Sequence, residues 1–208
     1  MEAVGQEGEV LLAACRLSRR FGSELALAPT DLEVRAGDVL ALVGPNGAVK
    51  STMLALLAGA LEPTAGAVER RDGVRVGWAP QRPGHYARLS ALENLRLFAQ
   101  LAEEADPEAA AERLVQRYDL PDSNRLSGDL SVGMRQRLNL AIAELGSPQV
   151  LLLDEPTASL DQEQRRRLWE TIAAHTGAGG SVVFATQNIE EVERATRVAR
   201  LRDGELVA

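Results

Sequence analysis

The segment from Gly44 to Thr52 constrains this chain more than any other part of its sequence. It follows an apolar run at residues 39–43, which predicts a buried strand, and precedes an apolar run at residues 53–58, which predicts a helix. A strand, a glycine-bearing turn, a lysine, a hydroxyl residue and a helix, in this order, are typical of a phosphate-binding loop. The alternative interpretation is an ordinary corner between a strand and a helix.

The chemistry of this loop follows from its place before a helix. Backbone N–H groups at a helix start lack partners, and the helix dipole favours an anion there. Lys50 adds a positive charge for the outer phosphates, and the Ser51 hydroxyl can ligate Mg²⁺, a hard cation that takes oxygen ligands. We expect phosphate binding along the whole loop: Gly44, Pro45, Asn46, Gly47, Ala48, Val49, Lys50, Ser51 and Thr52.

Val49 departs from the pattern G-x-x-x-x-G-K-[ST], whose second glycine falls at this position. Glycine tolerates unusual backbone angles and lets the main chain approach a ligand closely. Valine is β-branched and stiff at χ1, and it brings two methyl groups to this place. The loop is therefore recognisable but altered, which raises the question of whether it still binds phosphate.

Composition and charge exclude several classes of protein. The chain has 208 residues and a formal net charge of −7. This acidic balance argues against a duplex-DNA binder, which normally carries a basic footprint, so we expect no nucleic-acid partner. Cys15 is the single cysteine, which excludes a disulfide within the chain and a cysteine-based zinc site.

Neither a signal peptide nor a membrane span is predicted. Residues 1–8 are acidic and glycine-bearing, unlike a secretory signal. No run approaches the roughly 20 apolar residues that cross a bilayer. We expect a cytoplasmic protein that serves any membrane process from the inner face of the membrane, through a separate membrane partner.

Strand and helix patterns alternate along the chain and predict an α/β fold with a mainly parallel sheet. One domain is expected over residues 1–208, with a core built around the phosphate loop (P-loop), an antiparallel β portion near the N-terminus and a helical insert at residues 82–146. The expected strands are 9–16, 31–35, 39–43, 67–70, 74–78, 150–153, 181–185, 198–201 and 205–207. The expected helices are 53–58, 89–101, 109–118, one beginning near 131, 161–174 and 189–195.

Two adjacent carboxylates, Asp154 and Glu155, follow the apolar run at residues 150–153. Ligands in open α/β sheets bind outside the carboxyl ends of the strands, so both acids are expected near the phosphate loop. Asp154 is suited to orient a metal ion, and Glu155 to accept a proton from an attacking water. The alternative is a pair of acids that cap the following helix.

The segment Leu130-Ser131-Val132-Gly133-Met134 lies just before these acids and is followed by Arg-Gln-Arg. Together with the phosphate loop and the acidic pair, it resembles the ATP-binding cassette (ABC) ATPase family, whose signature is Leu-Ser-Gly-Gly-Gln. The resemblance covers residues 10–207. A second Leu-Ser-Gly stands at residues 126–128, but the match to Gly133 and to the basic continuation favours Ser131.

The resemblance implies that two cassettes pair head to tail and sandwich two ATP molecules with Mg²⁺. Ser131 and Gly133 would then face the γ-phosphate held by the other cassette, and Asp161 would lie in a loop at the same interface. The alternative for both Ser131 and Asp161 is a simple helix N-cap, because each precedes a predicted helix.

Two smaller matches complete the nucleotide site that the resemblance implies. Gln81 corresponds to the glutamine that senses Mg²⁺ and contacts the membrane subunit; the alternative is an ordinary exposed loop glutamine. Phe21 corresponds to the aromatic residue that stacks on adenine; the alternative is a core phenylalanine. The metal ligands implied are Ser51, Gln81 and Asp154.

Gln187 is the second departure from the family pattern, which usually has a threonine-histidine pair after this strand. The pair here is Thr186-Gln187. Glutamine can donate and accept hydrogen bonds but cannot become cationic. The catalytic residues implied are Glu155, Gln187 and Lys50, and the retained Glu155 argues for hydrolysis while Val49 and Gln187 argue against efficient turnover.

The function implied is that of the ATP-hydrolysing subunit of an ABC transporter, which drives a separate membrane permease. The chain ends soon after the last core strand and resembles the short cassettes of exporters. Two alternatives stay open. One is a degenerate cassette that binds ATP with little hydrolysis and regulates a heterodimeric partner; the other is a non-membrane ABC ATPase of translation or DNA repair.

Overall fold

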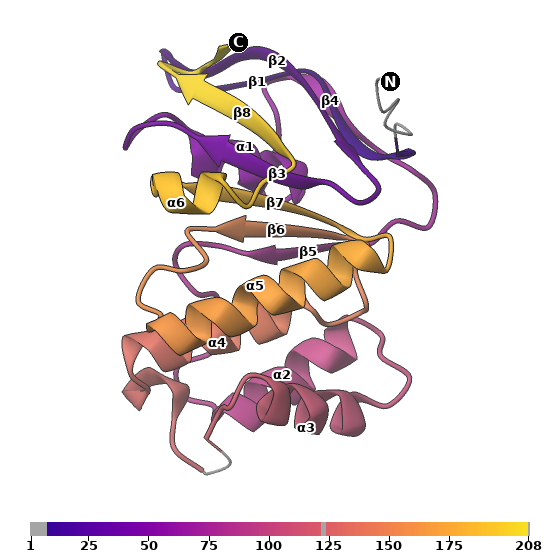
Figure 1. The fold of residues 1–208 in the computed structure, drawn as a ribbon, viewed down its shortest axis with the longest axis vertical. Coiled ribbons are helices and arrows are strands. Elements are labelled where there is room, and N and C mark those ends of the chain that lie inside the picture. The colour runs from indigo at the N-terminus through magenta and orange to yellow at the C-terminus, as the bar shows by residue number, and fades with distance from the viewer. Residues whose placement is uncertain (1–7, 122–123, 208) are drawn as a thin grey trace.

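A computed structural model describes residues 8–121 and 124–207 as two β-sheets with helices between them and below them (Figure 1). The smaller sheet has three antiparallel strands in the order β2-β1-β4. The larger sheet has six strands in the order β5-β6-β7-β3-β8-β9. The strands are β1 Val10–Phe21, β2 Glu24–Arg35, β3 Val39–Val43, β4 Ala65–Arg70, β5 Val76–Ala79, β6 Val150–Asp154, β7 Ser181–Thr186, β8 Arg197–Arg202 and β9 Glu205–Val207.

The larger sheet is parallel except at its edge, where β9 runs antiparallel to β8. Its central strands β3, β6 and β7 are buried on both faces, which explains their continuous apolar sequences. In register, Val39 lies opposite Val182, and Leu153 lies opposite Phe184. The carboxyl ends of β3, β6 and β7 therefore meet at one edge, where the acidic pair and the phosphate loop emerge.

Helices cover both faces of this sheet. Helix α1 (Lys50–Leu57) lies between the two sheets, where Met53 and Leu54 are fully buried in the largest apolar cluster. Helix α5 (Gln162–Gly177) packs on the opposite face, where Trp169 contacts Phe184 edge to face with ring centroids 5.2 Å apart. Helix α6 (Ile189–Val192) is a single turn after β7.

The helical insert contains α2 (Ala91–Leu101), α3 (Pro107–Arg117) and α4 (Val132–Ala143), with a short 3-10 turn at Ser127–Asp129. It has an apolar core of its own, to which Leu95, Leu114 and Leu138 contribute. Proline at the first position of α3 and a capping box at Ser90 of α2 set where these helices begin. The expected α/β class, parallel sheet, antiparallel N-terminal portion and helical insert are confirmed.

Several predicted boundaries were wrong. Strand β1 continues beyond residue 16 to Phe21, because it forms a hairpin with β2 in which Phe21 lies opposite Glu24. Strand β4 begins at Ala65 instead of residue 67, since Gly66 sits directly against the backbone of β1. Helix α6 ends at Val192 instead of residue 195, because the next N–H groups bond three residues back in turns.

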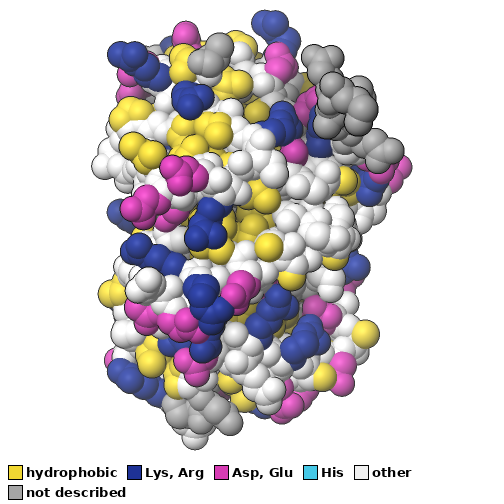
Figure 2. Space-filling model, viewed as in Figure 1, with side chains coloured by type: hydrophobic (Ala, Val, Ile, Leu, Met, Phe, Trp, Pro, Cys, Tyr) yellow, Lys and Arg dark blue, Asp and Glu magenta, His cyan; other side chains and the backbone are white. Residues whose placement is uncertain are grey.

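The exposed face of α5 mixes both signs of charge, as Figure 2 shows. Arg166 pairs with Glu163 at 2.7 Å and also with Glu170, and Arg167 pairs with Glu163 at 2.9 Å. Arg166 and Arg167 thus belong to a network of ion pairs on a solvated helix face. Of the helices in residues 8–121 and 124–207, not one has the length and apolar character needed to cross a bilayer.

Candidate functional site

The phosphate loop, the acidic pair and Gln81 line one open cavity of about 260 Å³ at the carboxyl ends of the central strands. Strand β3 leads into the loop, helix α1 leaves it, and β6 brings the two acids beside it. The lining residues are Asn46, Gly47, Ala48, Val49, Lys50, Ser51, Thr52, Gln81, Asp154 and Glu155. Residues from three separate segments of the chain therefore meet here, as expected from the sequence.

Two positions of the loop have left-handed backbone angles. Gly47 has a φ of 83°, and Val49, the N-cap of α1, has a φ of 57° and a ψ of 23°. Gly44 is required for a different reason, because an added Cβ would lie 2.2 Å from the Leu201 carbonyl oxygen. The loop thus keeps the tight curvature that directs backbone N–H groups toward an anion, although valine replaces glycine at its last turn.

Val49 fits because of where its side chain lies. It is partly buried and packs against the apolar cluster around α1 and β3. The left-handed conformation costs a β-branched residue roughly 1–3 kcal/mol, and the packing of its methyl groups offsets part of this. The backbone therefore adopts the conformation that the glycine of the common pattern would use.

Lys50 is buried, and its ammonium group lies inside the loop. Its Nζ donates to the Gly44 carbonyl oxygen at 2.7 Å and to the Pro45 carbonyl oxygen at 3.1 Å. These carbonyls hold the cation next to the N-terminus of α1, which has no side-chain cap and whose first N–H groups lack partners within the helix. The arrangement supplies a positive charge and several hydrogen-bond donors to an anion in the cavity.

Asp154 is only 3% exposed, and its Oδ1 atom has no hydrogen-bond partner within the described part of the chain. Burial raises the pKa of this carboxyl above its usual value, against hydrogen bonds from the Ser51 hydroxyl and the Gln81 backbone N–H and the charge of Lys50, all of which lower it. An unpaired buried oxygen beside a hydroxyl fits a hard cation that binds oxygen.

The rest of the donor set also fits Mg²⁺ better than a metal held by a cage of side chains. Within residues 8–121 and 124–207, no group of three or more histidine, cysteine, aspartate or glutamate side chains could hold a metal ion. Mg²⁺ needs few protein ligands, because water and phosphate oxygens complete its shell. Ser51, Gln81 and Asp154 would hold it here.

Glu155 and Gln187 contact each other across the ends of β6 and β7. The Gln187 Nε2 atom donates to Glu155 Oε1 at 3.2 Å. Glu155 has a φ of 50°, a strained conformation for a non-glycine residue, and its backbone N–H bonds the Ala185 carbonyl at 3.0 Å. The glutamine that replaces histidine is therefore in direct contact with the expected proton acceptor.

The structure separates the two serines that compete for the signature position. Ser127 is fully buried, where its hydroxyl donates to the Tyr86 carbonyl at 2.8 Å and accepts from Asn94 at 3.2 Å. Ser131 is exposed at the start of α4, and its Oγ accepts from the Met134 N–H at 3.2 Å. Only Ser131 is accessible to a ligand, and it also serves as an N-cap.

Gly133 and Phe21 lie outside the phosphate cavity. An added Cβ at Gly133 would lie 2.9 Å from the Ser159 carbonyl oxygen, so a side chain there would displace the loop after β6. Phe21, at the end of β1, is 48% exposed, and the Arg19 guanidinium lies 4.8 Å from its ring centroid. A core phenylalanine is therefore excluded, and the Arg19 guanidinium lies over the ring.

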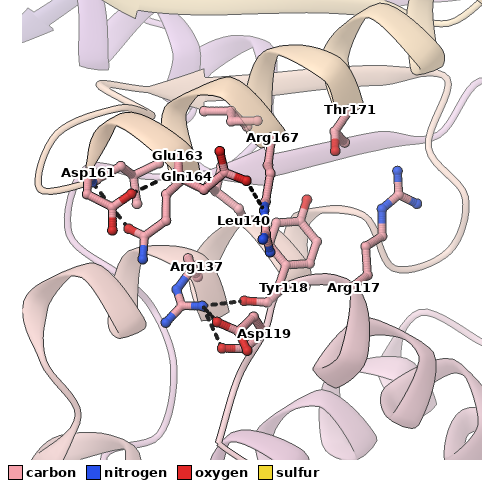
Figure 3. Close-up of a pocket in the computed structure, with 12 residues that line it drawn as sticks. Arg117, Tyr118, Asp119, Arg137, Leu140, Asp161, Glu163, Gln164, Arg167 and Thr171 are labelled. Atoms are coloured by element: carbon pink, nitrogen blue, oxygen red, sulfur yellow. Dashed lines mark hydrogen bonds and ion pairs between the residues drawn. The ribbon is translucent and has the colours of Figure 1, made fainter.

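A second cavity, of about 170 Å³, lies between α5 and the end of α3 (Figure 3). Asp161 caps α5 at its edge, accepting from the Gln164 N–H at 2.8 Å. Arg137 donates to the Tyr118 carbonyl at 2.9 Å and to the Asp119 carboxylate at 3.0 Å. These polar groups already bind one another, which leaves few of them available to a ligand. Asp161 thus acts in this chain as an N-cap.

One polar cluster near the acids has little signal in the sequence. Glu191 is 6% exposed, and both Thr157 and Thr186 donate their hydroxyl hydrogens to its carboxylate. The sequence carries a weak signal for it, a glutamate one helical turn after the Thr186-Gln187 pair, but the partner Thr157 is 34 residues away. Contacts over that distance cannot be inferred from local patterns.

Comparison with known proteins gives consistent matches over most of the chain. The sequence model of the family described as ABC transporter matches residues 27–158. The chain is 39% identical to the probable multidrug ABC transporter ATP-binding protein YbhF of Escherichia coli K12 over 207 residues, which cover 92% of this chain and 36% of YbhF. It is 37% identical to the daunorubicin resistance ATP-binding protein DrrA3 of Streptomyces coeruleorubidus, covering 91% of this chain and 65% of DrrA3. The chain thus spans less than two thirds of either relative.

A solved structure has the same architecture. The ATP-binding cassette MJ0796, in a dimeric post-hydrolysis state bound to ADP and phosphate, superimposes with a TM-score of 0.85 at 24% identity. The match covers 95% of this chain and 97% of that chain. At this identity, the likeness establishes the shared fold.

Proposed function

The chain belongs to the ABC transporter family, and on this premise we propose that it is the nucleotide-binding subunit of an ABC transporter. It binds ATP with Mg²⁺, hydrolyses ATP to ADP and phosphate, and drives a separate membrane permease from the cytoplasmic face of the membrane. It works as a dimer with a second cassette. The dimeric state of the structurally similar cassette MJ0796 supports this arrangement.

One observation carries the proposal: Lys50, Asp154 and Glu155 all line the same cavity, and Asp154 has a buried oxygen without a hydrogen-bond partner in the described part of the chain. ATP is expected to lie with its outer phosphates against the loop N–H groups, where Lys50 exchanges its two carbonyl partners for phosphate oxygens. When bound, Mg²⁺ neutralises charge on those oxygens. The loop and Lys50 stabilise the charge that develops during transfer of the phosphoryl group.

Glu155 is the proposed proton acceptor for the attacking water. Gln187 holds the Glu155 side chain by the 3.2 Å hydrogen bond and keeps one carboxylate oxygen occupied. The other oxygen is then available to the water. In this role glutamine acts as a fixed hydrogen-bond donor, so turnover does not depend on the titration of a side chain at position 187.

The second cassette completes the site in this proposal. Ser131 and the N-terminus of α4 would face the γ-phosphate that the partner cassette holds, and Asp161 would lie near the same interface. Phe21 would stack on adenine. Gln81, exposed at the cavity rim, would link the metal site to the permease. The accessibility of Ser131, Phe21 and Gln81 supports these roles.

The transported compound is proposed from the relatives. The names of YbhF and DrrA3 refer to multidrug transport and daunorubicin resistance. We propose export of a small organic compound by the complete transporter. Cells that express this chain with its permease should retain less daunorubicin than cells that express the Glu155→Gln form; equal retention would contradict this substrate class.

The degenerate cassette is not favoured. Val49 adopts the backbone conformation that glycine would use, and Gln187 reaches Glu155, so neither departure disrupts the cavity. A non-membrane ABC ATPase is not favoured either, because the relatives found are transporter and drug-resistance subunits.

Steady-state ATP hydrolysis and ATP affinity test the proposal directly. With Mg²⁺, the wild-type protein should turn over, and Glu155→Gln should bind ATP with similar affinity while losing roughly 100-fold or more in kcat. Glu112→Gln, an exposed glutamate of α3, is the matched control and should behave as wild type. Failure of the wild-type protein to bind ATP would overturn the proposal.

A further inference from the structure

A buried carboxylate lies near Glu155 and Gln187, the catalytic pair, and outside the lining of the phosphate cavity. Glu191, on the single turn of α6, is 6% exposed, although glutamate is rarely buried without partners. Taking a charged group out of water is costly unless hydrogen bonds replace its hydration. Its burial next to a proposed catalytic site therefore needs an explanation in its contacts.

Each oxygen of this carboxylate accepts a hydrogen bond from a different threonine. Thr186 Oγ1 donates to Glu191 Oε2 at 2.6 Å, and Thr157 Oγ1 donates to Glu191 Oε1. Both threonines are themselves buried, at 1% and 6% exposure. Hydrogen bonds to an ionised acceptor are shorter and stronger than neutral ones. Glu191 thus joins the end of β7 to the loop after β6.

The two threonines are the near neighbours of the catalytic pair. Thr186 directly precedes Gln187, and Thr157 lies two residues after Glu155. The Thr186 hydroxyl also accepts a hydrogen bond from the Asn188 N–H at 3.0 Å, which anchors the backbone on the other side of Gln187. The carboxylate consequently spans the same two segments as the Glu155–Gln187 hydrogen bond.

The hydrogen bonds of Glu191 form a second link between these segments, which helps to hold a strained residue in place. Glu155 has a φ of 50°, and a strained residue persists only where its surroundings over-determine it. The Glu155–Gln187 bond lies partly in solvent, where water competes for both partners. The buried link behind it does not face that competition.

We propose that Glu191 is a positioning residue, which holds Glu155 and Gln187 at catalytic distance by bonding Thr157 and Thr186. It lies outside the lining of the phosphate cavity and acts through the two loops. The inference rests on the proposed function, since it assigns a role in the hydrolysis attributed to Glu155. The competing explanation is that the cluster only stabilises the fold.

The test compares variants that remove or keep one hydroxyl. Thr157→Val removes the hydroxyl with little change in shape, Thr157→Ser keeps it, and Glu191→Leu removes both hydrogen bonds. Glu190→Gln is the matched control, an exposed neighbour on the same turn. Thr157→Val and Glu191→Leu should lower kcat roughly tenfold or more, with KM for ATP within about threefold of wild type. Thr157→Ser and Glu190→Gln should keep the wild-type kcat.

A double-mutant cycle distinguishes positioning from stability. If Thr157 acts through the catalytic pair, Thr157→Val should cost much less kcat in a Gln187→Ala background than in wild type. Equal losses in the two backgrounds would overturn the proposal. So would unchanged kcat in a Thr157→Val protein that folds, or a loss that Thr157→Ser shares.

A crystal structure of Thr157→Val tests the inference without turnover. The Gln187 Nε2 to Glu155 Oε1 distance, 3.2 Å here, should lengthen beyond hydrogen-bonding range, while Thr157→Ser should retain it. An unchanged distance in Thr157→Val would contradict the positioning role. An inactive wild-type protein would overturn the proposed function instead, and this structural readout would still decide whether Glu191 sets the geometry.

Discussion

The Gln187 side chain donates a hydrogen bond from Nε2 to Glu155 Oε1 across 3.2 Å, and this contact links the ends of two buried parallel strands. The two residues are 32 positions apart in sequence. A neutral amide therefore takes the place where the family usually has an imidazole, and it still reaches the carboxylate.

A second carboxylate at position 187 should shift the pH dependence of turnover. In Gln187→Glu, two acids would lie about 3 Å apart, and like charges at that distance raise the pKa of one of them. The pair of acids would then lose its second proton only at higher pH, so the acid limb of the kcat–pH profile should move upward. Gln187→Ala, the neutral control, should lose roughly tenfold in kcat without moving this limb. Profiles with the same limb in both variants would contradict the prediction.

Substitutions at Val49 should change the free energy of unfolding in an unusual order, with the glycine variant more stable than the alanine variant. Alanine keeps the unfavourable positive φ and loses the packed methyl groups, whereas glycine carries no such strain. We expect Val49→Ala to be less stable than Val49→Gly by about 0.5–1 kcal/mol in urea unfolding. Ala55→Gly, inside the same helix with ordinary angles, should instead lower stability by about 0.5–1 kcal/mol. A Val49→Ala protein as stable as Val49→Gly would show that backbone strain is unimportant here.

Asp154 should destabilise the nucleotide-free protein at neutral pH. Burial raises its pKa in the folded chain, so protonation favours folding. Its stabilising contribution is complete at acid pH, below the unfolded value, and is lost as pH rises through the folded pKa. In EDTA, Asp154→Asn should therefore raise Tm at pH 7 by about 2 °C or more, and this gain should shrink as the pH falls toward 4. The exposed Asp72→Asn should show no such pH-dependent gain.

The same Asp154→Asn variant separates stability from function. It should lose Mg²⁺-dependent ATP turnover while gaining stability, because this proposed metal ligand is buried with one oxygen that has no hydrogen-bond partner in the described part of the chain. Thermal unfolding and ATPase assays on one preparation check both effects. A variant that loses stability at pH 7 would contradict this assignment of the carboxylate.

Phe21 should contribute to ATP affinity and little to stability. The ring is 48% exposed, so its truncation removes little buried surface, while stacking on a base is worth roughly 1–3 kcal/mol. Phe21→Ala should weaken ATP binding roughly tenfold in a direct titration and leave Tm nearly unchanged. Leu25→Ala is the matched control, since Leu25 is 46% exposed and pairs with the neighbouring Arg20. Equal effects of the two substitutions would exclude a stacking role for Phe21.

Local patterns in the sequence were sufficient for much of the fold. The apolar runs of β3, β6 and β7 predict buried strands wherever they lie in the sheet, and the loop from Gly44 to Thr52 is built from consecutive residues. The starts of α4 and α5 follow from Ser131 and Asp161, whose side chains bond N–H groups three residues ahead. These features depend on interactions within a few residues, so their signals survive in the linear chain.

Tertiary structure decided what depends on distant segments. Strands β4 and β5 are neighbours in sequence, yet β4 joins the antiparallel sheet with β1 and β5 joins the parallel sheet with β6, and local patterns do not distinguish these partners. Polar strand ends, as in β1 beyond residue 16, form because a partner backbone is present. The sequence alone identified the phosphate loop, the acidic pair and Gln187 as separate signals. Only the tertiary structure brings Glu155 into contact with Gln187 and places Glu191 between Thr157 and Thr186. The reason is that hydrogen bonds between loops depend on how the strands that carry them pair.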